Sequence, residues 1–229
     1  MPYERTIICL AASWRPDGLC IAGRVYEDER FGDWVRPVSH RATMEINDGE
    51  RRKDNARLAE VLDVVTISFD SPAPKGHQTE NHLISEGLQW RHDARLRYND
   101  VLTAVDGDRW QDLWGVGSQS RGHKNNKVEA GSVFSFNHSL VLIEVNNFEL
   151  IVDWHPRRSG RRYRGAFGFQ AHDYTLSVTD PWISARYRRN DTYLLKDVVL
   201  CLSLGDKYKK GVCYKLIAAV VTPERNWIQ

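Results

Sequence analysis

The sequence lacks any apolar run long enough to cross a bilayer, since even its longer runs are as short as Ala218–Val221. Its N-terminus is unlike a signal peptide, because Glu4 precedes the short apolar stretch Thr6–Ala12 and no Ala-x-Ala cleavage site follows. The four cysteines form no Cys-x-x-Cys pair and lie in apolar segments, which is typical of free thiols in a reducing compartment. We therefore expect a cytoplasmic protein that is not inserted in a membrane.

Motifs of catalysis and metal binding are also missing. The sequence contains no His-x-x-x-His, His-Glu-x-x-His or Gly-x-Ser-x-Gly pattern. The segment Gly117–Lys124 faintly resembles a phosphate-binding loop, but His123 separates Gly122 from Lys124, and Asn125 stands where such loops carry Ser or Thr. We expect no catalytic residues, metal ion or cofactor, although this loop still offers backbone N–H groups to an anion.

What the chain does have is the composition of a soluble globular protein: of its 229 residues, 41% are hydrophobic and 27% charged. The net charge of +2 shows no overall basic excess. Residues 1–130 hold 18 basic and 21 acidic residues, a net charge of −3, whereas residues 131–229 hold 14 and 9, a net charge of +5. The basic residues are concentrated in the C-terminal part, which favours an anion-binding surface there.

Short segments rich in β-branched residues and bounded by turn residues predict an all-β fold. The expected strands are Thr6–Ala12, Leu19–Tyr26, Trp34–Val38, Leu62–Phe69, two within Leu140–Trp154, Arg162–Phe169, His172–Thr179, Val198–Leu204 and Val212–Thr222. Between the first two, Arg15–Gly18 predicts a turn in which Pro presets φ and Gly takes the strained position. Helical spacing is confined to about 86–114 and to 181–189. We expect two small β-barrels, at 1–130 with the helical insert and at 131–229.

Arginines cluster at the start of one expected strand, where five fall within Arg157–Arg164, and again at Arg186–Arg189. The first run is either a solvated hairpin tip or a surface that binds a polyanion. Tyr163 and Trp154 lie beside it, and they either fill a barrel interior or stack on bases. The residues predicted to contact nucleic acid are Trp154, Arg157, Arg158, Arg161, Arg162, Tyr163, Arg164, Arg186, Arg188 and Arg189.

Several separated motifs, in the same order, resemble those of the bacterial dual-OB family, whose members contain two tandem oligonucleotide-binding (OB) barrels. The motifs are Ile8–Ala11, Cys20–Gly23, Trp34–Ser39, Gln78–Asn81, Leu176–Pro181, Leu202–Gly205 and Cys213–Ala219. The resemblance implies two OB-like barrels and an accessory or sensor protein in bacterial defence against phage. It implies no catalytic residues, and the run Arg157–Arg164 is not part of the pattern.

Polar residues within these motifs form a second group of candidates, for a ligand pocket: Arg36, Ser39, Gln78, Glu80, Asn81, Ser177, Thr179 and Asp180. Arg36 is suited to pair with a phosphate or with a buried carboxylate such as Asp180. Asp180 or Thr179 is placed to cap a helix that begins at Pro181. These residues either brace the fold through hydrogen bonds or bind a nucleotide.

The sequence thus predicts non-catalytic binding of single-stranded nucleic acid, either RNA or ssDNA, because arginine makes bidentate contacts with phosphate. Two alternatives stay open. One is a protein-interaction adaptor whose basic loop docks on an acidic partner. The other is a nucleotide-sensing module with a pocket where Arg36, Gln78, Asn81 and Asp180 converge. A steep dependence of affinity on salt distinguishes a nucleic-acid binder from the adaptor.

Overall fold

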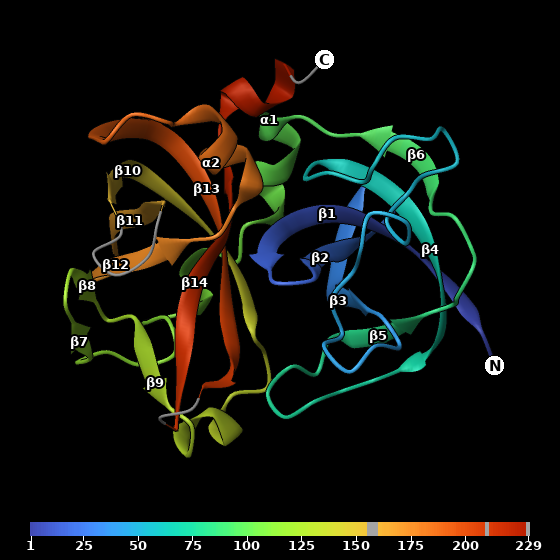
Figure 1. Ribbon diagram of the computed structural model, residues 1–229, viewed down its shortest axis with the longest axis horizontal. Coiled ribbons are helices and arrows are strands. Elements are labelled where there is room, and N and C mark those ends of the chain that lie inside the picture. Colours follow the sequence, from blue (N-terminus) through green and yellow to red (C-terminus); the bar gives the residue numbers. More distant parts are fainter. Residues whose placement is uncertain (155–159, 209–210, 228–229) are drawn as a thin grey trace. The chain divides into compact units, whose positions relative to one another are not determined.

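The structure is a computed structural model that describes residues 1–154, 160–208 and 211–227, and the chain forms two compact units (Figure 1). Unit 1 is Met1–Ala104 and unit 2 is Val105–Gln229. The division lies earlier than the boundary expected near residue 130, because strand β9 (Lys127–Glu129) pairs with β14 (Val212–Val221) of unit 2. Unit 2 carries 18 basic and 13 acidic residues, so its net charge is +5.

Five strands of unit 1 close into a barrel: β1 (Tyr3–Arg15), β2 (Gly18–Glu27), β3 (Arg30–Val38), β4 (Asp63–Pro72) and β5 (Asn81–Ile84). Their order is β1-β2-β3-β5-β4, and the barrel closes because β1 also pairs with β4. A register shift between Cys9 and Ala11 lets the long strand β1 bend between its two neighbours. A sixth strand, β6 (Arg91–Arg95), extends the sheet at β4.

The interior of the unit 1 barrel is packed with the apolar residues that alternate along these strands, and Ile7, Leu10, Ile21, Ile67 and Phe69 are almost completely buried. The expected turn between the first two strands is confirmed, since Arg15 pairs with Gly18. Gly18 does not adopt a positive φ, however. It is required because a Cβ there would lie 2.5 Å from the Ile46 carbonyl oxygen.

Unit 2 repeats the arrangement with β10 (Leu140–Trp154), β11 (Arg161–Phe169), β12 (His172–Val178), β13 (Asp191–Tyr208) and β14. In both units the first strand pairs with the second and the fourth, and the third and fifth strands run parallel. Helix α2 (Pro181–Arg186) connects β12 to β13. The core includes Phe148, Leu150, Leu176, Ile183 and Leu202, all almost completely buried.

A segment before β10 adds three short strands to the edges of the unit 2 barrel. Strands β7 (Gln119–Ser120) and β8 (His123–Lys124) form a hairpin within the expected loop 115–127, and β8 pairs with β12 at Thr175. Strand β9 pairs with β14. The loop is therefore part of the folded unit, and its hairpin lies next to β11 and β12 (Figure 1).

The helix expected at about 86–114 is wrong for most of its length. Residues Arg91–Arg95 form β6, which pairs with Asp63–Thr66 of β4. Only α1 (Tyr98–Val101) is α-helical there, and single 3₁₀ turns follow at 102–104 and 107–109. An available strand edge therefore outweighed the local spacing of apolar residues. The second expected helix is confirmed as α2.

Two expected strand boundaries are also wrong. Leu140–Trp154 is one continuous strand in which Asn146 and Asn147 are both exposed, and Asn147 still pairs with Lys196 of β13. Gly205–Lys207, expected as a turn, belongs to β13, which continues to Tyr208. The long first and fourth strands are what close the unit 2 barrel.

Candidate nucleic-acid interface

Two arginines of β11, Arg162 and Arg164, are held on the outer face of unit 2 by a single carboxylate. Register places Asp153 of β10 opposite Arg162. The Asp153 carboxylate accepts hydrogen bonds from Arg162 at 2.9 and 2.7 Å and from Arg164 at 2.7 Å. The hydrogen bond from Arg162 is the main cause that lowers the pKa of Asp153 to about 2, although partial burial opposes it. Two guanidinium groups thus share one negative charge, and the cluster keeps a net positive charge.

Hairpin β7–β8 packs against this cluster. The Gly122 carbonyl accepts a hydrogen bond from Arg164, and His123 Nε2 lies 3.1 Å from Ser177 Oγ. Gly122 has a φ of +72°, so its backbone conformation favours glycine, and a Cβ there would lie 2.6 Å from Arg164 Nη1 and displace the end of that side chain. Burial, together with the charges of Arg164 and Arg162, lowers the pKa of His123. Ser177 is therefore a partner of the hairpin.

Trp154 and Arg161 face solvent where β10 ends and β11 begins. They are paired in register, Arg161 is exposed, and Trp154 is 58% exposed. Tyr163 differs, because its ring packs against the core of unit 2 and its hydroxyl donates to the Ser184 carbonyl at 3.3 Å. Of the two aromatic residues Trp154 and Tyr163, Trp154 is thus the one whose ring is open to a ligand. Arg157 and Arg158 lie outside the described residues.

The second arginine cluster follows α2. Arg186 pairs with Glu224 at 2.6 Å and lies over the Trp182 ring at 5.4 Å, with half of its side chain exposed. Arg188 Nε donates to the Ala185 carbonyl, and Arg188 and Arg189 are exposed. This cluster is therefore accessible, although Glu224 neutralises one of its three charges.

The polar candidates of unit 1 form a buried network between β3 and β5. Arg36 pairs with Glu80 at 2.9 Å, and both side chains are at most 5% exposed. Asn81 lies opposite Arg36 in the parallel register, and its Nδ2 donates to Gln78 Oε1 at 3.4 Å. Ser39 Oγ, also buried, accepts a hydrogen bond from a backbone N–H of the loop that follows β3. The Arg36–Glu80 pair connects the two parallel strands that complete the unit 1 barrel, and the other two contacts are local.

Asp180 is the centre of a buried polar network in unit 2. Its Oδ1 accepts from the Trp182 N–H at 2.9 Å, which confirms it as the cap of α2. Its Oδ2 accepts from Arg225 at 2.6 Å and from the Val220 N–H at 2.9 Å. Thr179 donates to a β14 carbonyl, that of residue 217, at 3.1 Å. Arg36 pairs with a buried carboxylate of its own unit, that of Glu80, and Asp180 pairs with Arg225 of unit 2.

Of the residues named for a nucleotide pocket, Arg36, Gln78 and Asn81 belong to unit 1 and Asp180 to unit 2, and each is at most 4% exposed. The sequence pattern does not reveal Asp153, the partner of Arg162 and Arg164, or Arg225, the partner of Asp180. Asp153 is one acidic residue within a strand, and only the strand register shows that it faces arginines. Arg225 follows the last strand in a 3₁₀ turn, so nothing local connects it to Asp180.

No helix among the described residues is long and apolar enough to span a membrane. Within those residues, no group of three or more His, Cys, Asp or Glu side chains is arranged to hold a metal ion.

Both barrels have the strand order of the OB fold, a five-stranded barrel in Greek-key arrangement, and the chain is a tandem OB-fold protein. Comparison with protein-family models matches the dual OB-containing domain over residues 5–220. The chain belongs to this family. No curated protein matches it.

Proposed function

We propose that the chain binds single-stranded nucleic acid along β11 of unit 2. The observation that carries the proposal is the pair Arg162 and Arg164 on one face of the second strand of an OB barrel, with the exposed Arg161 and Trp154 where β10 ends and β11 begins. In OB folds the second and third strands, with the loops that flank them, commonly bind oligonucleotides. This region lies in unit 2, which has a net charge of +5. That charge also supports binding of nucleic acid at this face.

Phosphate is the part of the ligand that this cluster suits best. Arg162 and Arg164 against the single charge of Asp153 leave a charge of +1 on the cluster, and Arg161 at the start of the strand adds another positive charge nearby. Asp153 holds the guanidinium groups of Arg162 and Arg164 in place, so they lose little conformational entropy when a phosphate binds. Arg161, the first residue of β11, is not held by Asp153 in this way. Phosphate contacts of this kind give affinity without sequence preference.

A base stacked on Trp154 adds the second part of the interaction. Stacking of a base on an aromatic ring contributes about 1–3 kcal/mol and requires a base that is free of its complementary strand. This favours single-stranded RNA or ssDNA over duplex. Arg186, Arg188 and Arg189 offer a second set of phosphate contacts for a longer strand. A role as an accessory or sensor protein in bacterial defence is proposed on the family resemblance alone.

Fluorescence anisotropy tests the proposal, with labelled single strands and a duplex of about 20 nucleotides at several salt concentrations from about 50 to 200 mM. One variant replaces Arg161, Arg162 and Arg164 by Ala. The matched control replaces three exposed arginines of unit 1, Arg5, Arg30 and Arg57, so the total charge is the same. A third variant, Trp154→Ala, leaves the Asp153 cluster intact.

We expect the β11 variant to flatten the slope of log affinity against log salt by about 2, since each phosphate contact on a single strand contributes about 0.7. Trp154→Ala should weaken single-strand binding at least fivefold, the lower end of the stacking contribution. The unit 1 control should bind like wild type. Absence of binding at low salt, or equal losses in the β11 variant and the control, would overturn the proposal. An acidic protein partner would then be the better candidate ligand.

A further inference from the structure

Four aromatic rings lie together in the segment before β10, away from the β11 arginines in sequence. Trp110 stacks on His138 with ring centroids 4.0 Å apart, and Trp114 lies nearly parallel to the same imidazole at 5.8 Å. Phe136 meets His138 edge-on at 6.3 Å. A cavity of about 140 Å³ is lined by these four rings together with Gln111 and Asp112. Its size and walls suit one planar ring system.

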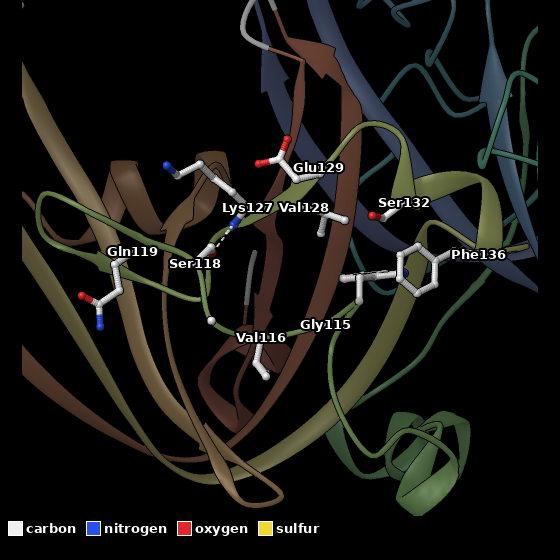
Figure 2. Close-up of a pocket in the computed structure, with 11 residues that line it drawn as sticks. Gly115, Val116, Ser118, Gln119, Lys127, Val128, Glu129, Ser132 and Phe136 are labelled. Atoms are coloured by element: carbon white, nitrogen blue, oxygen red, sulfur yellow. Dashed lines mark hydrogen bonds between the residues drawn. The ribbon is translucent and has the colours of Figure 1, made fainter.

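A larger cavity, of about 460 Å³, shares Trp114 and Phe136 with the first. Figure 2 shows Phe136 and Ser132 along one side of it, with Lys127 and Glu129 at the top. This volume is in the range of sites for small organic molecules. The two cavities together therefore offer aromatic walls for a flat group and a polar space, lined by one cation, Lys127, and one carboxylate, Glu129, for what is attached to it.

The loop around Trp114, a residue that lines both cavities, is fixed in place. The Leu113 N–H donates to the Tyr174 hydroxyl at 3.1 Å, and the Gly115 N–H donates to Asp112 Oδ1 at 2.6 Å. The Gly115 carbonyl accepts a hydrogen bond from the buried ammonium of Lys215. Such a preformed site spends little free energy on ordering when a ligand enters.

Polar groups in the smaller cavity define the edge of the flat ligand. The Trp110 indole N–H is buried and has no hydrogen-bond partner among the described residues, and a shift of the indole ring would bring it to an acceptor on a ligand. The Asp112 carboxylate uses Oδ1 for Gly115 and keeps its second oxygen for a donor. A ligand that fits is planar and carries N–H donors next to a carbonyl acceptor. The Watson–Crick edge of guanine has this pattern.

We infer that this aromatic cavity binds the nucleobase of a guanine nucleotide, with its sugar and phosphate in the larger cavity near Lys127. The base packs against the Trp110–His138 stack and Phe136, and Asp112 accepts its N–H groups. This site is separate from the β11 arginines and does not rest on strand binding there. Free nucleotide and the terminal nucleotide of a strand share this chemistry.

Isothermal titration calorimetry with GMP, AMP, CMP and UMP tests the inference on the full chain. We expect saturable binding with GMP the tightest ligand. Trp110→Leu should weaken it by on the order of tenfold, as loss of one stacking ring does. Asp112→Asn still accepts the Gly115 N–H but should reduce the preference for GMP over AMP. Trp14→Leu, a change of a 57% exposed tryptophan in unit 1, is the matched control and should bind like wild type.

Three outcomes would overturn the inference: no saturable binding of GMP up to about 10 mM, equal affinity in the folded Trp110→Leu variant, or loss of GMP binding in the β11 arginine variant instead. Circular dichroism establishes that each variant is folded. Competition with GMP by a short RNA that ends in guanosine identifies a strand end as ligand, and failure to compete identifies the free nucleotide. The β11 variant should lose strand binding and keep GMP binding, so the two proposals fail independently.

Discussion

Lys215→Met is expected to change how the stability of the protein depends on pH. Lys215 lies on β14 and is only 1% exposed. Its ammonium donates to the Gly115 carbonyl and lies 5.5 Å from the centre of the Tyr174 ring. Burial lowers its pKa to about 8, and the charge of Asp112 opposes that shift only in part.

The sign and size follow from proton linkage. In the unfolded chain the lysine pKa is about 10.5, so between pH 8 and 10.5 the unfolded state binds a proton that the folded state does not. Wild type should therefore gain stability as pH rises through this window. A difference of about 2.5 pKa units corresponds to about 3 kcal/mol. Methionine has no proton to release, so the variant lacks this gain.

Urea unfolding followed by circular dichroism, at intervals from about pH 7 to 10.5, gives the free energy of unfolding of both proteins. The difference between wild type and variant should be constant up to about pH 8 and then rise by about 3 kcal/mol. Tyrosines and cysteines that titrate in the same range largely cancel in this difference. Lys196→Met, at an exposed position, is the control and should show no such rise. A wild-type minus Lys215→Met difference that is flat across the window would refute the reasoning.

Three further predictions concern the barrels. Arg225→Met leaves the buried carboxylate of Asp180 without its partner and should lower the free energy of unfolding by about 3–5 kcal/mol, measured in urea. Gly165→Ala places a Cβ 2.3 Å from the ring of Phe148, so a loss of at least about 1–3 kcal/mol is expected, and a thermal midpoint equal to wild type would contradict the packing. Cys9 is buried and its thiol pKa is raised, mainly by burial, so iodoacetamide should label it only after unfolding, as mass spectrometry of its peptide can show.

Much of the fold could be predicted from local pattern. The Arg15–Gly18 turn, the hairpin at Gln170–Ala171 and the cap at Asp180 depend on residues that are neighbours in sequence. The alternation along β11 likewise places Phe167 and Phe169 in the core. Local information was enough in these cases because the interactions that decide the structure span only a few residues.

The rest depends on contacts between distant residues. The sequence of β6 has helical spacing, and the segment is a strand because it pairs with the edge of β4. The partners of Arg36 and Asp180 are at Glu80 and Arg225, and spacing does not reveal such pairs. The candidate site follows the same rule. Its arginines can be recognised in the sequence as a run, whereas the contact of Asp153 with them follows only from the register of β10 and β11.

The most direct test of the central claim is photocrosslinking of a single-stranded RNA that contains 4-thiouridine, followed by mass spectrometry of the peptides. Contact along β11 predicts crosslinks in the peptide that carries Trp154 and in the peptides of β11, and their loss at high salt. Crosslinks confined to unit 1, or crosslinks at β11 that persist when Arg161, Arg162 and Arg164 are replaced by Ala, would contradict it.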